Sequence, residues 1–115
     1  MSEETIATPR LMTIFAHPDD ESFGVAGTMA RARRLGYPVA VVCATRGEEG
    51  QIADPALATP ENLGEVREQE LRTAMRAVDV SDVVFLDYTD GHLAEADQEE
   101  ALGRVVAQIR RFRPD

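Results

Sequence analysis

The chain has 115 residues and a mass of 12.6 kDa, which is enough for one compact domain and too little for two. It has 12 basic and 21 acidic residues, and this excess of negative charge excludes the positive surface that nucleic-acid binding requires. With 43% hydrophobic and 29% charged residues, the composition is that of a globular protein rather than a disordered or membrane-spanning one.

The numbers of cysteine and lysine residues further limit which class of protein this can be. A single cysteine, Cys43, excludes an internal disulfide. Because the sequence also has no signal peptide and no long apolar run, it predicts a protein of the reducing cytoplasm that does not contact membranes. Every basic residue is an arginine, since the chain contains no lysine.

Three strands are predicted, each from a short apolar run of the kind that is buried in a parallel sheet. They are residues 11–16, 39–44 and 83–86. Three helices are predicted to alternate with them: residues 22–35, a helix that begins at Pro60, and a helix that Asp97 caps. The apolar stripe of the last helix runs from Leu102 to Phe112 and is expected to face the sheet.

This order predicts an α/β fold, namely a Rossmann-like parallel sheet with helices on both faces in three layers. The first strand is expected to lie beside the second. Residues 1–10 are predicted to be a loose arm in front of this single domain. The final residues, 113–115, resemble the start of a fourth strand. We therefore expect that the domain continues after its third βα unit, or that a second copy associates through the open edge of the first strand.

Three loops follow the carboxyl ends of the predicted strands, where open parallel sheets bind their ligands. They are residues 17–21, 45–51 and 87–92, and they contain both histidines and most of the clustered acidic residues. Because parallel strands end at one edge of a sheet, these loops are expected to meet there and form a site.

The first loop, His17-Pro18-Asp19-Asp20-Glu21, has three consecutive carboxylates, which would repel phosphate at close range. It also lacks the glycine pattern of a dinucleotide-binding turn. An imidazole from His17 and a carboxylate from Asp20 suit zinc or another divalent metal, and Asp19 would then face a water molecule. The same acids could instead cap a helix and interact with its dipole, so the residues alone leave both interpretations open.

The run Ala16-His17-Pro18-Asp19-Asp20-Glu21, after a short apolar strand, resembles the signature of the LmbE-like (PIG-L) de-N-acetylase family. The resemblance extends to Thr-Arg-Gly-Glu-Glu-Gly at 45–50, to Arg-Glu-Gln-Glu-Leu at 67–71 and to residues 87–93. It implies a zinc-dependent hydrolase that uses a metal-activated water to remove the acetyl group from an N-acetylglucosaminyl conjugate or a related small amide.

The resemblance also implies a role for particular residues. His17 and Asp20 would be ligands of Zn²⁺ or another divalent metal, and Asp19 would be the general base that takes a proton from the water. Arg67 would contact the polar or phosphorylated group attached to the amino sugar of the substrate, and Gln51 and Asp90 are candidates for contacts to the sugar itself. From the residues alone, Arg67 is also compatible with an ordinary helix-surface arginine that pairs with a neighbouring glutamate.

The chain departs from the family in its ligand set. A catalytic zinc normally has three protein ligands, and the family's third ligand is a histidine from a later motif that these 115 residues do not contain. His92 is interpreted as a turn residue rather than a ligand, and Glu48 and Glu49 as residues that order their loop. We therefore expect the isolated chain to bind zinc weakly and to be a poor hydrolase.

Two other classes of function compete with this prediction. A receiver-like signalling module would hold magnesium with Asp19, Asp20 and Asp87, but it would also require a lysine, which this chain lacks. The chain could also be a non-catalytic fragment or an interaction module.

Overall fold

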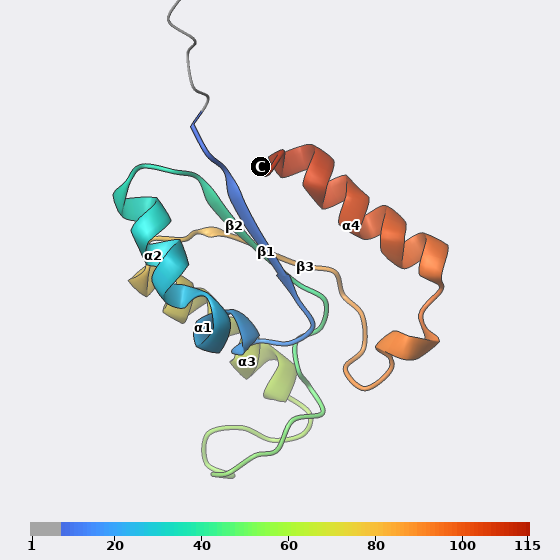
Figure 1. The fold of residues 1–115 in the computed structure, drawn as a ribbon. Coiled ribbons are helices and arrows are strands. Elements are labelled where there is room, and N and C mark those ends of the chain that lie inside the picture. The colour runs from blue at the N-terminus through green and yellow to red at the C-terminus, as the bar shows by residue number, and fades with distance from the viewer. Residues whose placement is uncertain (1–7) are drawn as a thin grey trace, which may run out of the picture.

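Three parallel strands and four helices form the protein, and the computed structural model describes residues 8–115 (Figure 1). The elements in chain order are β1 (Leu11–Phe15), α1 (Asp20–Gly24), α2 (Ala26–Arg34), β2 (Val39–Cys43), α3 (Leu63–Ala77), β3 (Asp82–Phe85), the 3₁₀ turn η1 (Leu93–Glu95) and α4 (Gln98–Phe112). The predicted strands are confirmed to within one residue at each end, and the α/β class is confirmed with them.

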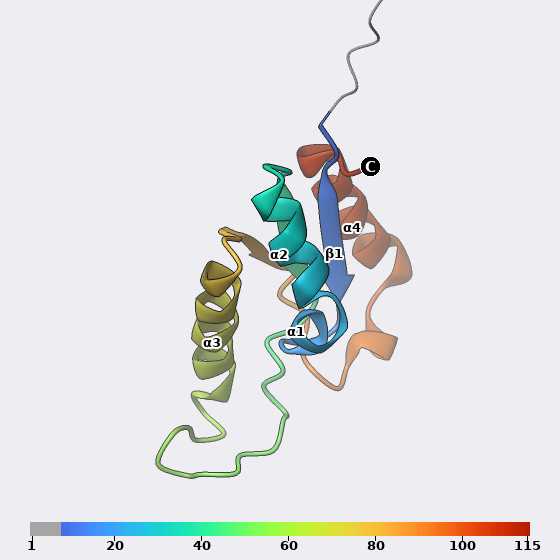
Figure 2. The ribbon, with the colours of Figure 1, turned by 60° about the vertical axis from the view of Figure 1, so that its left-hand side comes forward.

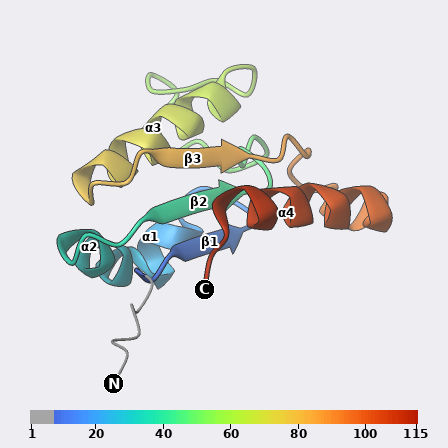
Figure 3. The same cartoon turned by 90° about the horizontal axis from the view of Figure 1, so that it is seen from above.

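The sheet has the order β1-β2-β3, and all three strands run in the same direction (Figure 3). The prediction that the first strand lies beside the second is therefore confirmed. Strand β2 is central and every one of its residues is buried. A receiver-like fold follows the order 2-1-3, which would place β1 in the centre. The observed order therefore rules out the receiver-like alternative.

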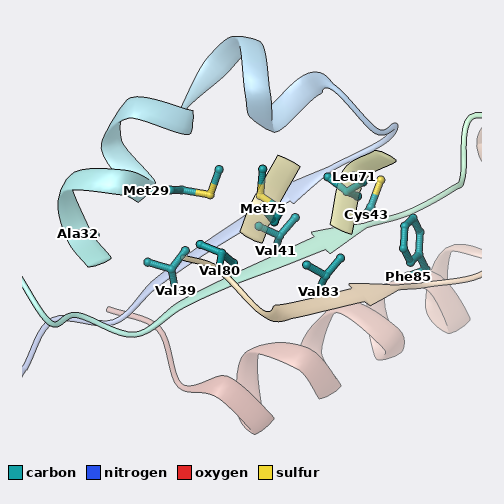
Figure 4. Packing of buried hydrophobic residues seen from close by; sticks show 10 residues of the cluster. All are labelled: Met29, Ala32, Val39, Val41, Cys43, Leu71, Met75, Val80, Val83 and Phe85. Carbon is teal, nitrogen blue, oxygen red and sulfur yellow. The ribbon is translucent and has the colours of Figure 1, made fainter. Parts of the chain in front are cut away.

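Helices cover both faces of the sheet, with α1, α2 and α3 on one side and α4 on the other (Figure 2). Side chains alternate along β2, so that Val39, Val41 and Cys43 point toward α2 and α3 (Figure 4). There they pack with Met29 of α2 and Met75 of α3, both of which are almost completely buried. This cluster is the main hydrophobic core, and it fixes the helices that follow β1 and precede β3.

Two helix boundaries differ from the prediction. The helix expected over residues 22–35 is two helices, because Val25 leaves the helical conformation at φ −140° and ψ 13°. Gly24 and the β-branched Val25 both have low helix propensity, which favours the break at this point. The helix expected at Pro60 begins at Leu63, since Thr59 and Asn62 first form a hydrogen-bonded turn.

The two ends of the described chain meet beside β1. The N–H of Asp115 donates to the carbonyl of Arg10 at 2.9 Å, and the N–H of Arg10 donates to Asp115 Oδ2 at 2.9 Å. Arg10, which the prediction placed in the loose arm, is thus bonded to the C-terminal residues, while residues 1–7 lie outside the described part. Strand β1 has β2 on one side only, and association of two copies through its other edge stays a prediction.

Helix α4 packs less completely than its sequence predicts. Asp97 caps it as expected, since its Oδ1 accepts the N–H of Glu100 at 2.9 Å. Phe112 is buried, but Leu102 is 64% and Ile109 is 40% exposed, so the prediction that the whole stripe faces the sheet was wrong for these two residues. Across residues 8–115, none of the helices is long and apolar enough to cross a membrane.

The contrast between two leucines tests this description of the core. Leu71 of α3 is 3% exposed and belongs to the core cluster, whereas Leu102 is largely in solvent. We expect Leu71→Ala to lower the free energy of unfolding by about 2–5 kcal/mol, because it removes buried surface and leaves a cavity. Leu102→Ala makes the same chemical change and should lower it by no more than about 0.5 kcal/mol. Urea unfolding of both variants measures the difference, and equal losses would contradict the described core.

Candidate active site

Backbone hydrogen bonds continue beyond the ends of the strands and bring the three predicted loops to one edge. The N–H of Ala44 donates to Phe15 O at 2.8 Å, and the N–H of Tyr88 donates to Ala44 O at 3.0 Å. Thr45 is fully buried, and its hydroxyl donates to Ala16 O at 2.9 Å. The first loop (17–21), the second loop (45–51) and the third loop (87–92) therefore start side by side, as the parallel sheet predicts.

His17 and Asp20 come together in the first loop. Asp20 Oδ2 accepts the backbone N–H of His17 at 3.1 Å, and the same oxygen lies 3.4 Å from Nδ1 of the imidazole. Two ligands of one tetrahedral zinc ion, at bond lengths of 2.0–2.2 Å, are about 3.3–3.5 Å apart. Both side chains are 42% exposed, so the space between them is open to solvent. The pair therefore fits two positions around a divalent metal.

Asp90 reaches the same imidazole from the third loop. Its Oδ1 lies 3.1 Å from Nε2 of His17, on the opposite side of the ring from Asp20. Its Oδ2 accepts the N–H of Glu49 at 3.0 Å, and its own N–H donates to Glu48 Oε1. The side chain of Glu48 and the backbone of Glu49 thus connect the second loop to the third, while an ordering role for the Glu49 side chain stays a prediction. Among residues 8–115, no group of three or more His, Cys, Asp or Glu side chains converges on a single metal position.

Asp19 lies next to the His17–Asp20 pair and is held in an uncommon backbone conformation. Its φ of +82° is in the left-handed region, which non-glycine residues seldom occupy, and such strain tends to gather at functional sites. Its side chain is 65% exposed. One carboxylate oxygen, Oδ2, lies 3.4 Å from Nη2 of Arg67. The carboxylate is therefore free to meet a water molecule or a substrate.

Arg67 of α3 connects the first two loops. Its guanidinium donates to Pro18 O at 2.9 Å and to Gly47 O at 2.8 Å. A Cβ at Gly47 would lie 2.0 Å from Nη1 of Arg67, and one at Gly50 would lie 2.9 Å from it, so both glycines make room for the guanidinium. The alternative that Arg67 pairs with a neighbouring surface glutamate does not agree with these contacts. The predicted contact of Arg67 with substrate stays a prediction.

A second arginine connects the second and third loops, and the sequence reasoning did not identify it. Arg46 donates to Glu68 Oε1 of α3 at 2.6 Å and to Asp87 Oδ1 at 2.5 Å. Its guanidinium also lies over the ring of Phe85, 4.6 Å from the centroid. Arg46 and Glu68 both lie within runs that resemble the family. Their pairing depends on how close the second loop lies to α3, and the sequence does not give that distance.

The structure separates the remaining predicted residues from the His17–Asp20 pair. Gln51 is exposed and lines a small pocket of about 160 Å³ with residues of the long loop and of α3, such as Leu57 and Leu63. Its predicted sugar contact stays a prediction. His92 lies in the turn before η1, where its Nδ1 is 2.7 Å from Glu95 Oε2. This hydrogen bond raises the pKa of His92 above its ordinary value, and it agrees with the interpretation of His92 as a turn residue.

The fold and this edge site place the chain among Rossmann-like α/β proteins that bind ligands at the carboxyl ends of their strands. The chain belongs to the PIG-L family, because residues 12–115 match the family described as GlcNAc-PI de-N-acetylase. The resemblance inferred from the sequence motifs is thereby confirmed.

Similar proteins carry names that agree with this family. A 1D-myo-inositol 2-acetamido-2-deoxy-alpha-D-glucopyranoside deacetylase from Kineococcus radiotolerans is 39% identical over 91% of the chain and 37% of its own length. A probable N-acetyl-alpha-D-glucosaminyl L-malate deacetylase 2 from Bacillus subtilis is 40% identical over 86% of the chain and 45% of its own length.

Among solved structures, the N,N'-diacetylchitobiose deacetylase from Pyrococcus horikoshii superposes with a TM-score of 0.81 and 28% identity. The superposition covers 92% of this chain and 38% of that one. The chain thus spans less than half of the length of these relatives.

The Arg46–Glu68 pair gives a pH-dependent prediction. The hydrogen bond from Arg46 holds the pKa of the Glu68 carboxyl below its ordinary value, so the pair stabilises the fold above the pKa of an unfolded glutamate, about 4.3. We expect Glu68→Gln to cost about 1–3 kcal/mol of unfolding free energy at pH 7. The gap from wild type should narrow as the pH falls through about 4.3 toward the lower folded pKa, where wild type loses the same contribution.

Urea unfolding at neutral and acidic pH measures this gap. Glu70→Gln is the matched control, because Glu70 is an exposed residue of the same helix and should leave stability close to wild type. A gap of constant size across this pH range would show that the ion pair is not its source.

The buried thiol gives a second prediction. Burial, and next the nearby Glu21 carboxylate, raise the pKa of Cys43 to about 12, and the side chain is 1% exposed. Since the thiolate is the reactive form, Cys43 should react very slowly with a disulfide reagent at pH 8 and rapidly once the chain is unfolded in urea. Rapid reaction of the folded chain would place Cys43 outside the core.

Proposed function

We propose that this chain forms the metal-binding and base-bearing part of a hydrolase that removes the acetyl group from N-acetylglucosaminyl conjugates. The observation that carries the proposal is the contact between His17 and Asp20 in the same loop as the exposed carboxylate of Asp19, in a chain of the PIG-L family. Hydrolysis of an acetamido group adds water across its C–N bond and yields acetate and a free amine. The chain must therefore provide a site for a metal and a group that moves protons.

His17 and Asp20 are the residues that would hold Zn²⁺ or another divalent metal, through the imidazole Nδ1 and the carboxylate. A nitrogen and an oxygen ligand are a donor set that suits zinc. When bound, such a metal supplies Lewis acidity, which makes water a nucleophile near neutral pH.

Asp19 is proposed as the general base. Its exposed carboxylate can accept a proton from the attacking water as the new C–O bond forms, and it can return the proton to the amine nitrogen as the C–N bond breaks. The contacts of Arg67 with Pro18 O and Gly47 O support this role, because they hold the loop that carries Asp19 against the second loop.

The proposed substrate class rests on what the names of the relatives share. All three contain an N-acetylated glucosamine unit, while the attached group is myo-inositol, L-malate or a second sugar. We therefore propose the acetamido sugar as the common part that this site recognises, with Arg67 and Gln51 as candidates for contacts to it or to the attached group. A cytoplasmic location and the lack of nucleic-acid binding stay predictions from composition.

Separate variants of the three residues distinguish a base from a ligand. In the protein as it occurs naturally, Asp19→Asn should lower kcat by about 10²–10⁴-fold while the bound metal remains, because only proton transfer is lost. His17→Ala or Asp20→Ala should instead remove most of the bound metal. Metal content by mass spectrometry and deacetylation of an N-acetylglucosaminyl conjugate are the two measurements.

Glu99→Gln, an exposed position on α4, serves as a control for loss of a carboxylate and should leave both measurements unchanged. Loss of metal in Asp19→Asn would make Asp19 a ligand, and unchanged metal content in both alanine variants would refute the metal assignment.

A further inference from the structure

The imidazole of His17 lies between two carboxylates, one at each ring nitrogen. Asp20 Oδ2 is 3.4 Å from Nδ1, and Asp90 Oδ1 is 3.1 Å from Nε2. The two nitrogens of an imidazole point in different directions, so a metal bound at one of them is out of reach of a carboxylate at the other. This agrees with the finding that no three metal-binding side chains converge among residues 8–115. Asp20 and Asp90 must therefore do different things.

Asp20 and Asp90 also differ in how exposed they are and in their hydrogen-bond partners. The side chain of Asp20 is 42% exposed, whereas that of Asp90 is only 12% exposed. Both oxygens of Asp90 have protein partners, since Oδ2 accepts the N–H of Glu49 while Oδ1 faces His17. Glu48 also fixes the backbone of Asp90 by accepting its N–H. Asp90 is thus a buried acceptor whose position is set by the second and third loops.

We propose that Asp90 is a positioning residue that binds the Nε2–H of His17 and thereby directs Nδ1 toward the metal beside Asp20. This inference rests on the proposed metal site. An ionised carboxylate can only accept hydrogen bonds. A neutral imidazole carries one proton, and Asp90 lies nearer to the ring, at 3.1 Å, than Asp20 does at 3.4 Å, so we place this proton on Nε2. The nitrogen that faces Asp20 is then the one that can donate its lone pair to a cation. Carboxylate partners of this kind fix both the orientation and the tautomer of metal-binding histidines.

This role differs from the sugar contact that the sequence resemblance implied for Asp90. Each oxygen of Asp90 already has one protein partner, so a sugar hydroxyl would have to reach the remaining lone pairs of a side chain that is only 12% exposed. Glu49 and His17 face different oxygens of Asp90, and an asparagine replaces one of these oxygens by an NH2 group, which donates and does not accept. Asp90→Asn therefore disturbs the contact to His17 with almost no change in size.

The first part of the test needs no metal. The chain contains two histidines, and ¹⁵N labelling of histidine with His92→Gln as the assignment variant isolates the signals of His17. We expect a slowly exchanging Nε2–H in the wild-type chain, its weakening or loss in Asp90→Asn, and its retention in Glu49→Gln. Glu49→Gln is the matched control, because it removes the same charge from an exposed position of the neighbouring loop and keeps the backbone N–H that Asp90 accepts. A wild-type chain without this protected proton would overturn the proposal.

The second part is a zinc titration of the same three chains, with circular dichroism to confirm that each variant is folded. Zinc should shift the Nδ1 signal and leave Nε2–H in place, and Asp90→Asn should bind zinc about 10–100-fold more weakly, with Glu49→Gln close to wild type. Zinc on Nε2, or equal losses in both variants, would overturn the proposal. A wild-type chain that has the protected Nε2–H but takes up no zinc would instead contradict the metal site of the proposed function, while confirming the bond between Asp90 and His17.

Discussion

Parallel pairing of β1, β2 and β3 is the constraint on which the rest of the molecule depends. Since β2 is central and fully buried, both neighbours are fixed in register against it. Backbone bonds beyond the strand ends, such as Tyr88 N to Ala44 O, extend this register into the loops. The result is that three segments far apart in the sequence start at one edge with their side chains within reach of one another. Without this register His17 and Asp90 could not meet.

Arginine side chains then connect the loops that the sheet brings together. Arg46 joins Glu68 and Asp87, and Arg67 joins the carbonyls of Pro18 and Gly47. A guanidinium has several N–H donors in a fixed plane and can hold two acceptors at once, which a lysine ammonium does less specifically. This explains how an acidic chain without lysine stabilises loops that are rich in carboxylates. It also explains why Gly47 and Gly50 lie beside Arg67, since a side chain at either position would collide with it.

The acidic residues at the carboxyl edge of the sheet have different roles, because this arrangement gives them different surroundings. Asp19 is exposed in the loop of the proposed metal ligands, Asp20 shares the space next to Nδ1 of His17, and Asp90 is buried behind the ring. Asp87 belongs to the scaffold through Arg46. Carboxylates of one chemical type thus take up different functions because their exposure and hydrogen-bond partners differ. The proposed metal-dependent deacetylation fits this division, since it would use both a metal site and a separate proton acceptor.

The sequence by itself determined the strands, the parallel fold and the edge where His17, Asp19 and Asp20 lie, because continuous apolar runs and a local histidine–aspartate motif act over short distances. It also predicted that Glu48 and Glu49 order their loop. Only the tertiary structure decided that Asp90 binds the back of the His17 ring, that Arg67 bonds to two distant carbonyls and that Leu102 stays exposed. Periodicity reports which face of an element is apolar, but not which distant atoms a long or buried polar side chain will meet. Those partners depend on loop geometry and on the register of the sheet, which exist only after the chain has folded.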